Sequence, residues 1–168
     1  MIENSLNTFG YLDKNNNKIC PYKNLISNNG FSTWPWFFPE GLPGFEENKE
    51  FAFLFNENSN PFILMNFCGD SKLSLMCVDP FFVLPDYELN LSKDDKLALN
   101  VSSVNELVVL VIVKIDKENI AKGIFSEGSL ILKSPLVFNP KNYYAKQISN
   151  GKPEYLEPYK FKDIKKLE

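Results

Sequence analysis

The stretch Leu107 to Ile115 reads LVVLVIVKI and carries seven consecutive aliphatic residues before its first charge. β-Branched and aliphatic residues are enriched in strands, and a run without polar alternation is typical of a strand buried on both faces. The run is also far too short to cross a bilayer as a helix, which takes about 20 residues. We therefore interpret it as a central strand of a folded domain.

Shorter segments on both sides of this strand carry strand patterns as well. In Glu50 to Phe55 the sequence EFAFLF alternates, which places Phe51, Phe53 and Phe55 on one face of a strand. The further predicted strands are Phe62 to Phe67, Leu73 to Val78, Phe81 to Leu84, Ser129 to Lys133, Leu136 to Phe138 and Tyr143 to Ile148. Prolines on both sides of Phe81 to Leu84 predict an edge strand there, and Pro135 is expected to separate the two segments beside it.

One segment has the pattern of a helix. Ser92 precedes KDDKLALN, and Asp95 stands three residues later, which matches a capping box. Short strands, frequent turns and one short connecting helix predict an all-β, compact, single-domain fold of barrel or sandwich type over residues 1–168. Residues 1–37 are interpreted as an N-terminal extension or a remodelled first strand, and residues 152–168 as a C-terminal tail, frayed or disordered from Phe161 onward.

The composition excludes several kinds of chemistry. The 168 residues include no histidine, and all 18 basic residues are lysines against 21 acids. A chain without histidine has no imidazole base, no Ser-His-Asp triad and no HExxH zinc site. A net charge of −3 also argues against direct binding of nucleic acid. We therefore expect no enzyme activity, no cofactor and no metal.

Charge is distributed unevenly along the chain. Residues 1–90 hold 5 lysines and 11 acids, whereas residues 91–168 hold 13 lysines and 10 acids. Acids that cluster in space form a surface suited to a basic partner. The N-terminal half is therefore the predicted source of such a surface.

The cysteines and the N-terminus bear on where the protein acts. Cys20, Cys68 and Cys77 contain no CxxC pair, and the last two lie in apolar segments where small buried side chains are expected. The first residues, MIENSLNTFG, lack the basic and apolar regions of a secretory signal. We predict a soluble, cytoplasmic protein that does not insert into a membrane.

Two segments stand out as candidate contact sites. Phe38 to Phe45 reads FPEGLPGF, and its two prolines and two glycines predict either a rigid inter-strand loop or a pre-organised contact loop. Asp79 to Glu88 reads DPFFVLPDYE, in which two carboxylates flank Tyr87, a residue type enriched in binding hot spots. Without a third catalytic group, these carboxylates fit an acidic rim better than an acid–base pair.

The aromatic cluster near residue 35 leaves an alternative open. Trp34 and Trp36 are either a stacking platform for a carbohydrate or another small ligand, or side chains that fill the end of a small barrel. The first interpretation would make the protein a small-ligand binding module, whereas the second assigns these side chains to the core.

The order of these motifs resembles that of the FliW family of bacterial flagellar assembly factors. GLPGFE (Gly41–Glu46) and DPFFVLPDYE carry the resemblance, followed by ELVVLVIVKI, SPLVFN and AKQI, over about Phe38 to Ile148. The family usually reaches its FPxGLPGF loop about 20 residues from the start, so the segment before it is unusual here.

The resemblance implies a non-enzymatic regulator with a compact β-barrel-like domain. Members bind flagellin and also bind the RNA-binding translational repressor CsrA, so that flagellin synthesis follows flagellin export. An acidic antagonist suits a basic RNA-binding protein. The predicted partner contacts, with apolar anchors and acidic groups for the basic partner, are Leu42, Phe45, Asp86, Tyr87 and Glu88.

Overall fold

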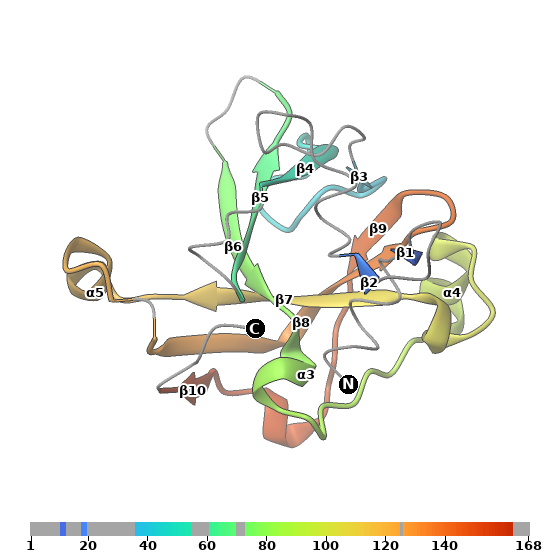
Figure 1. Ribbon diagram of the computed structural model, residues 1–168. Coiled ribbons are helices and arrows are strands. Elements are labelled where there is room, and N and C mark those ends of the chain that lie inside the picture. Colours follow the sequence, from blue (N-terminus) through green and yellow to red (C-terminus); the bar gives the residue numbers. More distant parts are fainter. Residues whose placement is uncertain are drawn as a thin grey trace.

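The strands of Figure 1 form a ring around a core that includes Phe51 and Phe53 of β4 (Glu50–Leu54). Phe51 and Phe53 have no exposed surface, as the alternation predicts. The computed structural model describes residues 11–12, 18–19, 36–54, 61–69, 73–124 and 126–162. Phe55, the third phenylalanine of this pattern, lies outside the described residues.

Seven strands close into a barrel. The ring runs β8-β7-β6-β5-β4-β3-β9 and returns to β8, while β10 lies outside the ring on β8. All neighbours are antiparallel except β3 and β9, which pair in parallel at Phe37 and Tyr144. The strands are β3 (Trp36–Phe37), β5 (Ile63–Phe67), β6 (Ser74–Val78), β7 (Val108–Lys114), β8 (Gly128–Asn139), β9 (Tyr144–Gln147) and β10 (Tyr159–Phe161). Two further strands, β1 (Tyr11–Leu12) and β2 (Lys18–Ile19), pair with each other.

The central strand β7 is buried on both faces, as its composition predicts. Val108 and Leu110 belong to the cluster that fills the barrel, together with Trp36 and the phenylalanines of β4. Val109 and Val111 belong to a second cluster outside the barrel wall. A strand between two apolar layers needs apolar side chains at every position, which explains the absence of alternation.

The segments on either side of Pro135 form one strand, β8, and the prediction of two separate strands was wrong. Leu136 pairs with Leu110 and Ile131 pairs with Ile112, so four residues of β8 oppose Val111 alone. A proline lacks a backbone donor but is tolerated at such a bulge, where the ladder is interrupted. The carbonyl of Pro135 still accepts a hydrogen bond from the N–H of Ile148 at 3.0 Å.

The segment predicted as the edge strand Phe81 to Leu84 is instead a short helix, α3 (Pro80–Val83). The Asp79 side chain accepts a hydrogen bond from the N–H of Phe81 at 2.8 Å. Pro80 stands at the start of the helix, where its missing donor costs nothing. The Asp-Pro pair is therefore a helix start, and its local pattern was misinterpreted as a strand boundary.

The predicted connecting helix is α4 (Lys93–Leu99). Its capping box is formed, because the Ser92 hydroxyl accepts from the N–H of Asp95 at 3.0 Å. Asn100 ends the helix in the left-handed conformation with a φ of 52°. The expectation of a single helix was wrong, since α3, α5 (Lys117–Ala121) and the 3₁₀ turns η2 (Val104–Glu106) and η3 (Pro153–Tyr155) also occur.

The C-terminal segment after residue 152 contributes the strand β10 to the fold. β10 pairs with the start of β8, and the side chains of Tyr155 and Phe161 are 4% and 7% exposed. Both pack in the second cluster, outside the barrel wall. Residues 163–168 lie outside the described residues.

The two described cysteines differ in exposure. Cys77 is buried, as expected, but Cys68 is exposed at the end of β5. Cys20 lies outside the described residues. Within the part of the chain that the structure describes, no helix is long and apolar enough to cross a membrane.

Candidate partner-binding site

The loop between β3 and β4 is held by backbone geometry that requires its glycines. Gly41 and Gly44 have φ values of 66° and 83°. A Cβ on Gly41 would lie 2.5 Å from the carbonyl oxygen of Glu46, so only glycine fits there. The N–H of Phe45 donates to the carbonyl of Leu42 at 2.7 Å and closes the turn.

Glu46 completes this loop from the other side. Its carboxylate accepts a hydrogen bond from the N–H of Gly44 at 2.9 Å. This bond to the charged form lowers the pKa of Glu46 below its ordinary value. The loop tip is thus pre-organised, which reduces the entropy lost when a partner binds.

The two apolar contact candidates of this loop have opposite environments. Leu42 is 3% exposed and packs in the barrel core, whereas the Phe45 ring is 47% exposed at the turn. A large apolar side chain held open to solvent on a rigid loop has the properties of a binding anchor. Leu42 holds the loop on the barrel.

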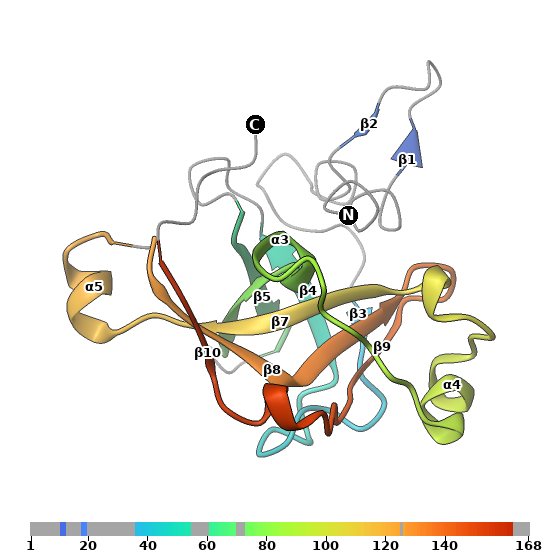
Figure 2. The same ribbon diagram turned by 90° about the horizontal axis from the view of Figure 1, so that it is seen from below.

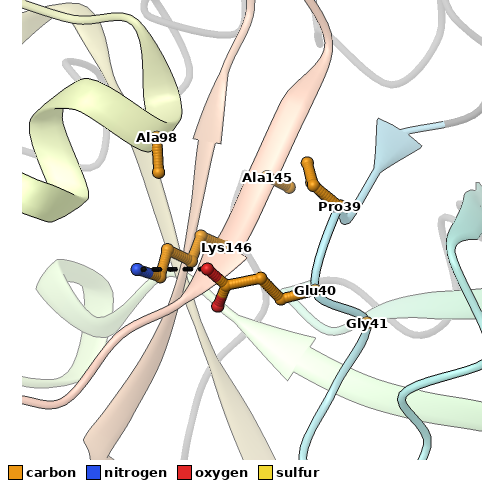
Figure 3. A pocket seen from close by; sticks show the side chains of 6 residues that line it. All are labelled: Pro39, Glu40, Gly41, Ala98, Ala145 and Lys146. Atoms are coloured by element: carbon orange, nitrogen blue, oxygen red, sulfur yellow. Dashed lines mark ion pairs between the residues drawn. The ribbon is translucent and has the colours of Figure 1, made fainter.

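A small surface hollow lies between this loop, β9 and α4 (Figure 3). Its lining residues are Pro39, Glu40, Gly41, Ala98, Ala145 and Lys146. Lys146 approaches Asp95 at 2.8 Å and Glu40 at 3.8 Å, and its side chain is only 20% exposed. The ammonium therefore bridges the loop and the helix across β9.

The protonation of this bridge follows from its contacts. Burial acts to raise the pKa of Asp95, but hydrogen bonds from Lys146 and Ser92 outweigh it, and the pKa lies below its ordinary value. The hydrogen bond to Asp95 raises the pKa of Lys146. Both groups are therefore charged near neutral pH, and the bridge is an ion pair.

The second segment, Asp79 to Glu88, contains α3, and the chain continues from it to α4 (Figure 2). Hydrogen bonds join its end to the chain around η3. Asp86 and Glu88 are exposed, but Tyr87 between them is 3% exposed. The Tyr87 hydroxyl donates to the carbonyl of Leu132 at 2.9 Å and accepts from the Asn150 amide at 3.2 Å. Burial raises the pKa of Tyr87 to about 12.

Asn150 and Tyr155 fix the backbone at Glu88, and Lys152 contacts its side chain. The Asn150 amide donates to the carbonyl of Glu88 at 2.7 Å, and the N–H of Glu88 donates to the Tyr155 hydroxyl at 2.9 Å. The Lys152 ammonium donates to the Glu88 carboxylate. Tyr87 therefore supports the segment from inside, while its two acidic neighbours present their carboxylates outward.

Both candidate segments contact the same short stretch of chain, between Lys146 and Lys152. Lys146 holds Glu40 of the first segment, and Asn150 and Lys152 hold Glu88 of the second. Six residues span at most about 20 Å, so both segments lie within reach of one protein partner. Lys146, Asn150 and Lys152 were not predicted, because no motif in the sequence links them to residues more than 60 positions earlier.

Trp36 is not part of an open platform. Its side chain is 1% exposed and packs edge-to-face on Phe138, with ring centroids 5.2 Å apart. Trp36 therefore fills the barrel, as the second interpretation of the aromatic cluster predicts. Trp34 lies outside the described residues.

Comparison with known proteins agrees with the motif order. The profile of the FliW protein family matches residues 32–160, a longer range than the predicted match from Phe38 to Ile148. The chain is 31% identical over 133 residues to the flagellar assembly factor FliW of Alkaliphilus metalliredigens, covering 78% of each chain. It is 38% identical over 113 residues to that of Treponema pallidum, covering 66% of this chain and 69% of the relative.

Comparison of the fold with solved structures gives the same result. A crystal structure of the flagellar assembly factor FliW superposes with a TM-score of 0.63 at 25% identity, covering 74% of this chain and 83% of that chain. Sequence and fold therefore match over most of the length, and the family profile spans residues 32–160. On these grounds the chain belongs to the FliW family.

Proposed function

We propose that this protein is a flagellar assembly factor that binds flagellin and the translational repressor CsrA in the cytoplasm and performs no catalysis. Flagellin occupies it while export is slow, and the free protein captures CsrA once flagellin has left. Family membership supports the class of function, and the resemblance described above supports the two partners.

The observation that carries the proposal is the exposed Phe45 ring on a loop locked by glycine geometry. An exposed aromatic side chain on a rigid loop favours binding of a partner, because little conformational freedom is lost on binding. The carboxylates of Asp86 and Glu88 add the negative potential that a basic RNA-binding protein requires.

Isothermal titration of the protein with CsrA and with flagellin of the same organism, at low and at high salt, tests this function. Binding of both proteins is expected, with flagellin displacing CsrA and with salt weakening CsrA binding. Absence of binding to either partner would overturn the proposal.

A charge-reversal variant tests whether Asp86 and Glu88 contact CsrA. Asp86→Lys combined with Glu88→Lys should weaken CsrA binding by about tenfold and leave thermal unfolding nearly unchanged, because an exposed ion pair such as Glu88–Lys152 contributes little. Asp116→Lys with Glu118→Lys is the matched control, since these acids are also exposed, two residues apart and carry the same charge. If both variants lost the same affinity for CsrA, Asp86 and Glu88 would not be part of the contact.

A further inference from the structure

The lysines of the described side chains divide into two groups. Lys141, Lys146 and Lys152 form ion pairs with Glu106, Asp95 and Glu88 respectively. Lys114, Lys160 and Lys162 are exposed and form no ion pair with any described side chain. Other described lysines, Lys93 and Lys96 among them, also form no ion pair with a described side chain, but Lys114, Lys160 and Lys162 lie close together where β7, β8 and β10 run side by side.

The strand register places two of these unpaired lysines in one line. Ser129 of β8 pairs with Lys114 of β7 on one side and with Lys160 of β10 on the other. Directly paired residues of neighbouring antiparallel strands project from the same face of the sheet. We call Lys114, Ser129 and Lys160 the lysine row. The strands that carry Lys114 and Lys160 are about 10 Å apart, twice the usual strand spacing.

The lysine row adjoins apolar surface. The next residues on the same face are Ile112 and Ile131, which pair with each other and are both half-buried. Ile112 packs against the barrel core, so the row extends the inner face of the barrel wall past the last pairing of β6 with β7. The opposite face of the same strands, with Val113, Leu130 and Phe161, is buried.

No described acid forms an ion pair with the lysines of the row. Glu127, two residues before Ser129, accepts a hydrogen bond from the Asn119 amide at 3.3 Å. Lys162 follows the end of β10, two residues after Lys160, and adds a further positive charge. The helix α5 projects from the ends of β7 and β8 (Figure 1) and leaves Ile120 50% exposed. This end of the molecule thus combines unpaired positive charge with accessible aliphatic side chains.

We propose that the lysine row, with Ile112 and Ile131, is a docking surface for an acidic, amphipathic segment of flagellin, separate from the acidic surface that faces CsrA. This inference rests on the proposed function. A carboxylate over Ser129 would lie about 5 Å from each flanking strand and so within the Debye length of about 8 Å of both ammonium groups. The Ser129 hydroxyl can donate to the same carboxylate.

Charge complementarity selects the partner. CsrA binds RNA and therefore carries basic surface, which two unpaired lysines repel. A segment that carries both carboxylates and apolar side chains can pair with the lysines of the row and pack on the adjacent Ile112 and Ile131. The two partners of the switch are thus distinguished by the sign of the surface that each one meets.

The test compares Lys114→Glu combined with Lys160→Glu against Lys93→Glu combined with Lys96→Glu. The second pair makes the same change in net charge at unpaired lysines on α4. Titration with flagellin should show an affinity about tenfold lower for the row variant and an affinity close to wild type for the control. Affinity for CsrA should not fall in the row variant.

Two further variants keep the result interpretable. Lys114→Arg with Lys160→Arg retains the charges and should bind flagellin as the wild type does, and Lys114→Gln with Lys160→Gln serves if the glutamates unfold the protein. Wild-type affinity for flagellin in the glutamate or glutamine variant, or equal losses in variant and control, would overturn the inference. Failure of the wild type itself to bind flagellin would instead overturn the proposed function.

Discussion

Leu42 and Phe45 stand three residues apart in one turn, yet one belongs to the core and the other to the surface. Their types alone do not distinguish them, because both are large and apolar. A glycine with positive φ precedes each of them, Gly41 before Leu42 and Gly44 before Phe45, and the turn leaves Leu42 buried and Phe45 exposed. The loop can therefore offer Phe45 to a partner while Leu42 holds it on the barrel.

Alanine variants of these two residues should therefore behave oppositely. Leu42→Ala should lower the free energy of unfolding by about 2–4 kcal/mol, because it removes buried side-chain volume. Phe45→Ala should change it by about 0.5 kcal/mol or less, as exposed substitutions do, but should reduce affinity for a protein partner by about tenfold or more.

Urea unfolding and isothermal titration with CsrA and flagellin measure the two effects. If Phe45→Ala unfolded as readily as Leu42→Ala, or bound both partners like the wild type, Phe45 would not be an anchor.

Among the elements, α4 depends on a single carboxylate for two purposes. Asp95 closes the capping box with Ser92 and also forms the ion pair with Lys146 that joins the helix to β9. Its side chain is only 14% exposed, so this pair is less screened by water than an ordinary surface pair. The helix has seven residues and could not form by itself in water.

Asp95→Asn should lower the free energy of unfolding by about 1 kcal/mol at neutral pH. The folded-state pKa of Asp95 lies below its ordinary value of 3.8. Its contribution is therefore present above pH 3.8 and is lost as the pH falls through the folded-state pKa. The difference between wild type and variant should shrink on acidification.

Urea titrations at neutral pH and in acid measure this difference. Asp94→Asn is the control, since Asp94 is exposed on the same turn without a described ion pair. A gap between wild type and Asp95→Asn that stayed constant into strong acid would show that the ion pair adds nothing.

At the scale of the whole molecule, the barrel is completed by pairings between distant parts of the chain. β9 closes the ring on β3, and β10 adds a strand to the start of β8. Long-range closure of this kind leaves no free edge within the ring, which protects a phenylalanine-rich chain from edge-to-edge association. The C-terminal segment is thereby part of the folded unit.

Phe161→Ala should lower the free energy of unfolding by about 3 kcal/mol, because Phe161 is buried in the outer cluster beside Phe62. Tyr159→Ala, on the same strand but 36% exposed, should cost about 1 kcal/mol or less. Urea unfolding of the two variants measures the contrast. Equal, small effects would mean that β10 is dispensable to the fold.

Local chemistry in the sequence was enough to predict several elements. The uninterrupted aliphatic run at Val108 to Val113 indicates a doubly buried strand, and the spacing of Ser92 and Asp95 indicates a capped helix. The GLPGF motif indicates a turn with positive φ at its glycines. Each depends on neighbours within a few residues, so sequence alone carries the information.

Other features were decided only by tertiary structure. Pro135 is accommodated because β7 presents one residue opposite four of β8, and Tyr87 is buried because Leu132 and Asn150 supply its hydrogen bonds. These partners lie about 25 to 60 positions away, and no local pattern encodes their proximity. The local sequence patterns therefore determined an all-β core and a rigid loop, whereas barrel closure determined which side chains of the candidate site face a partner.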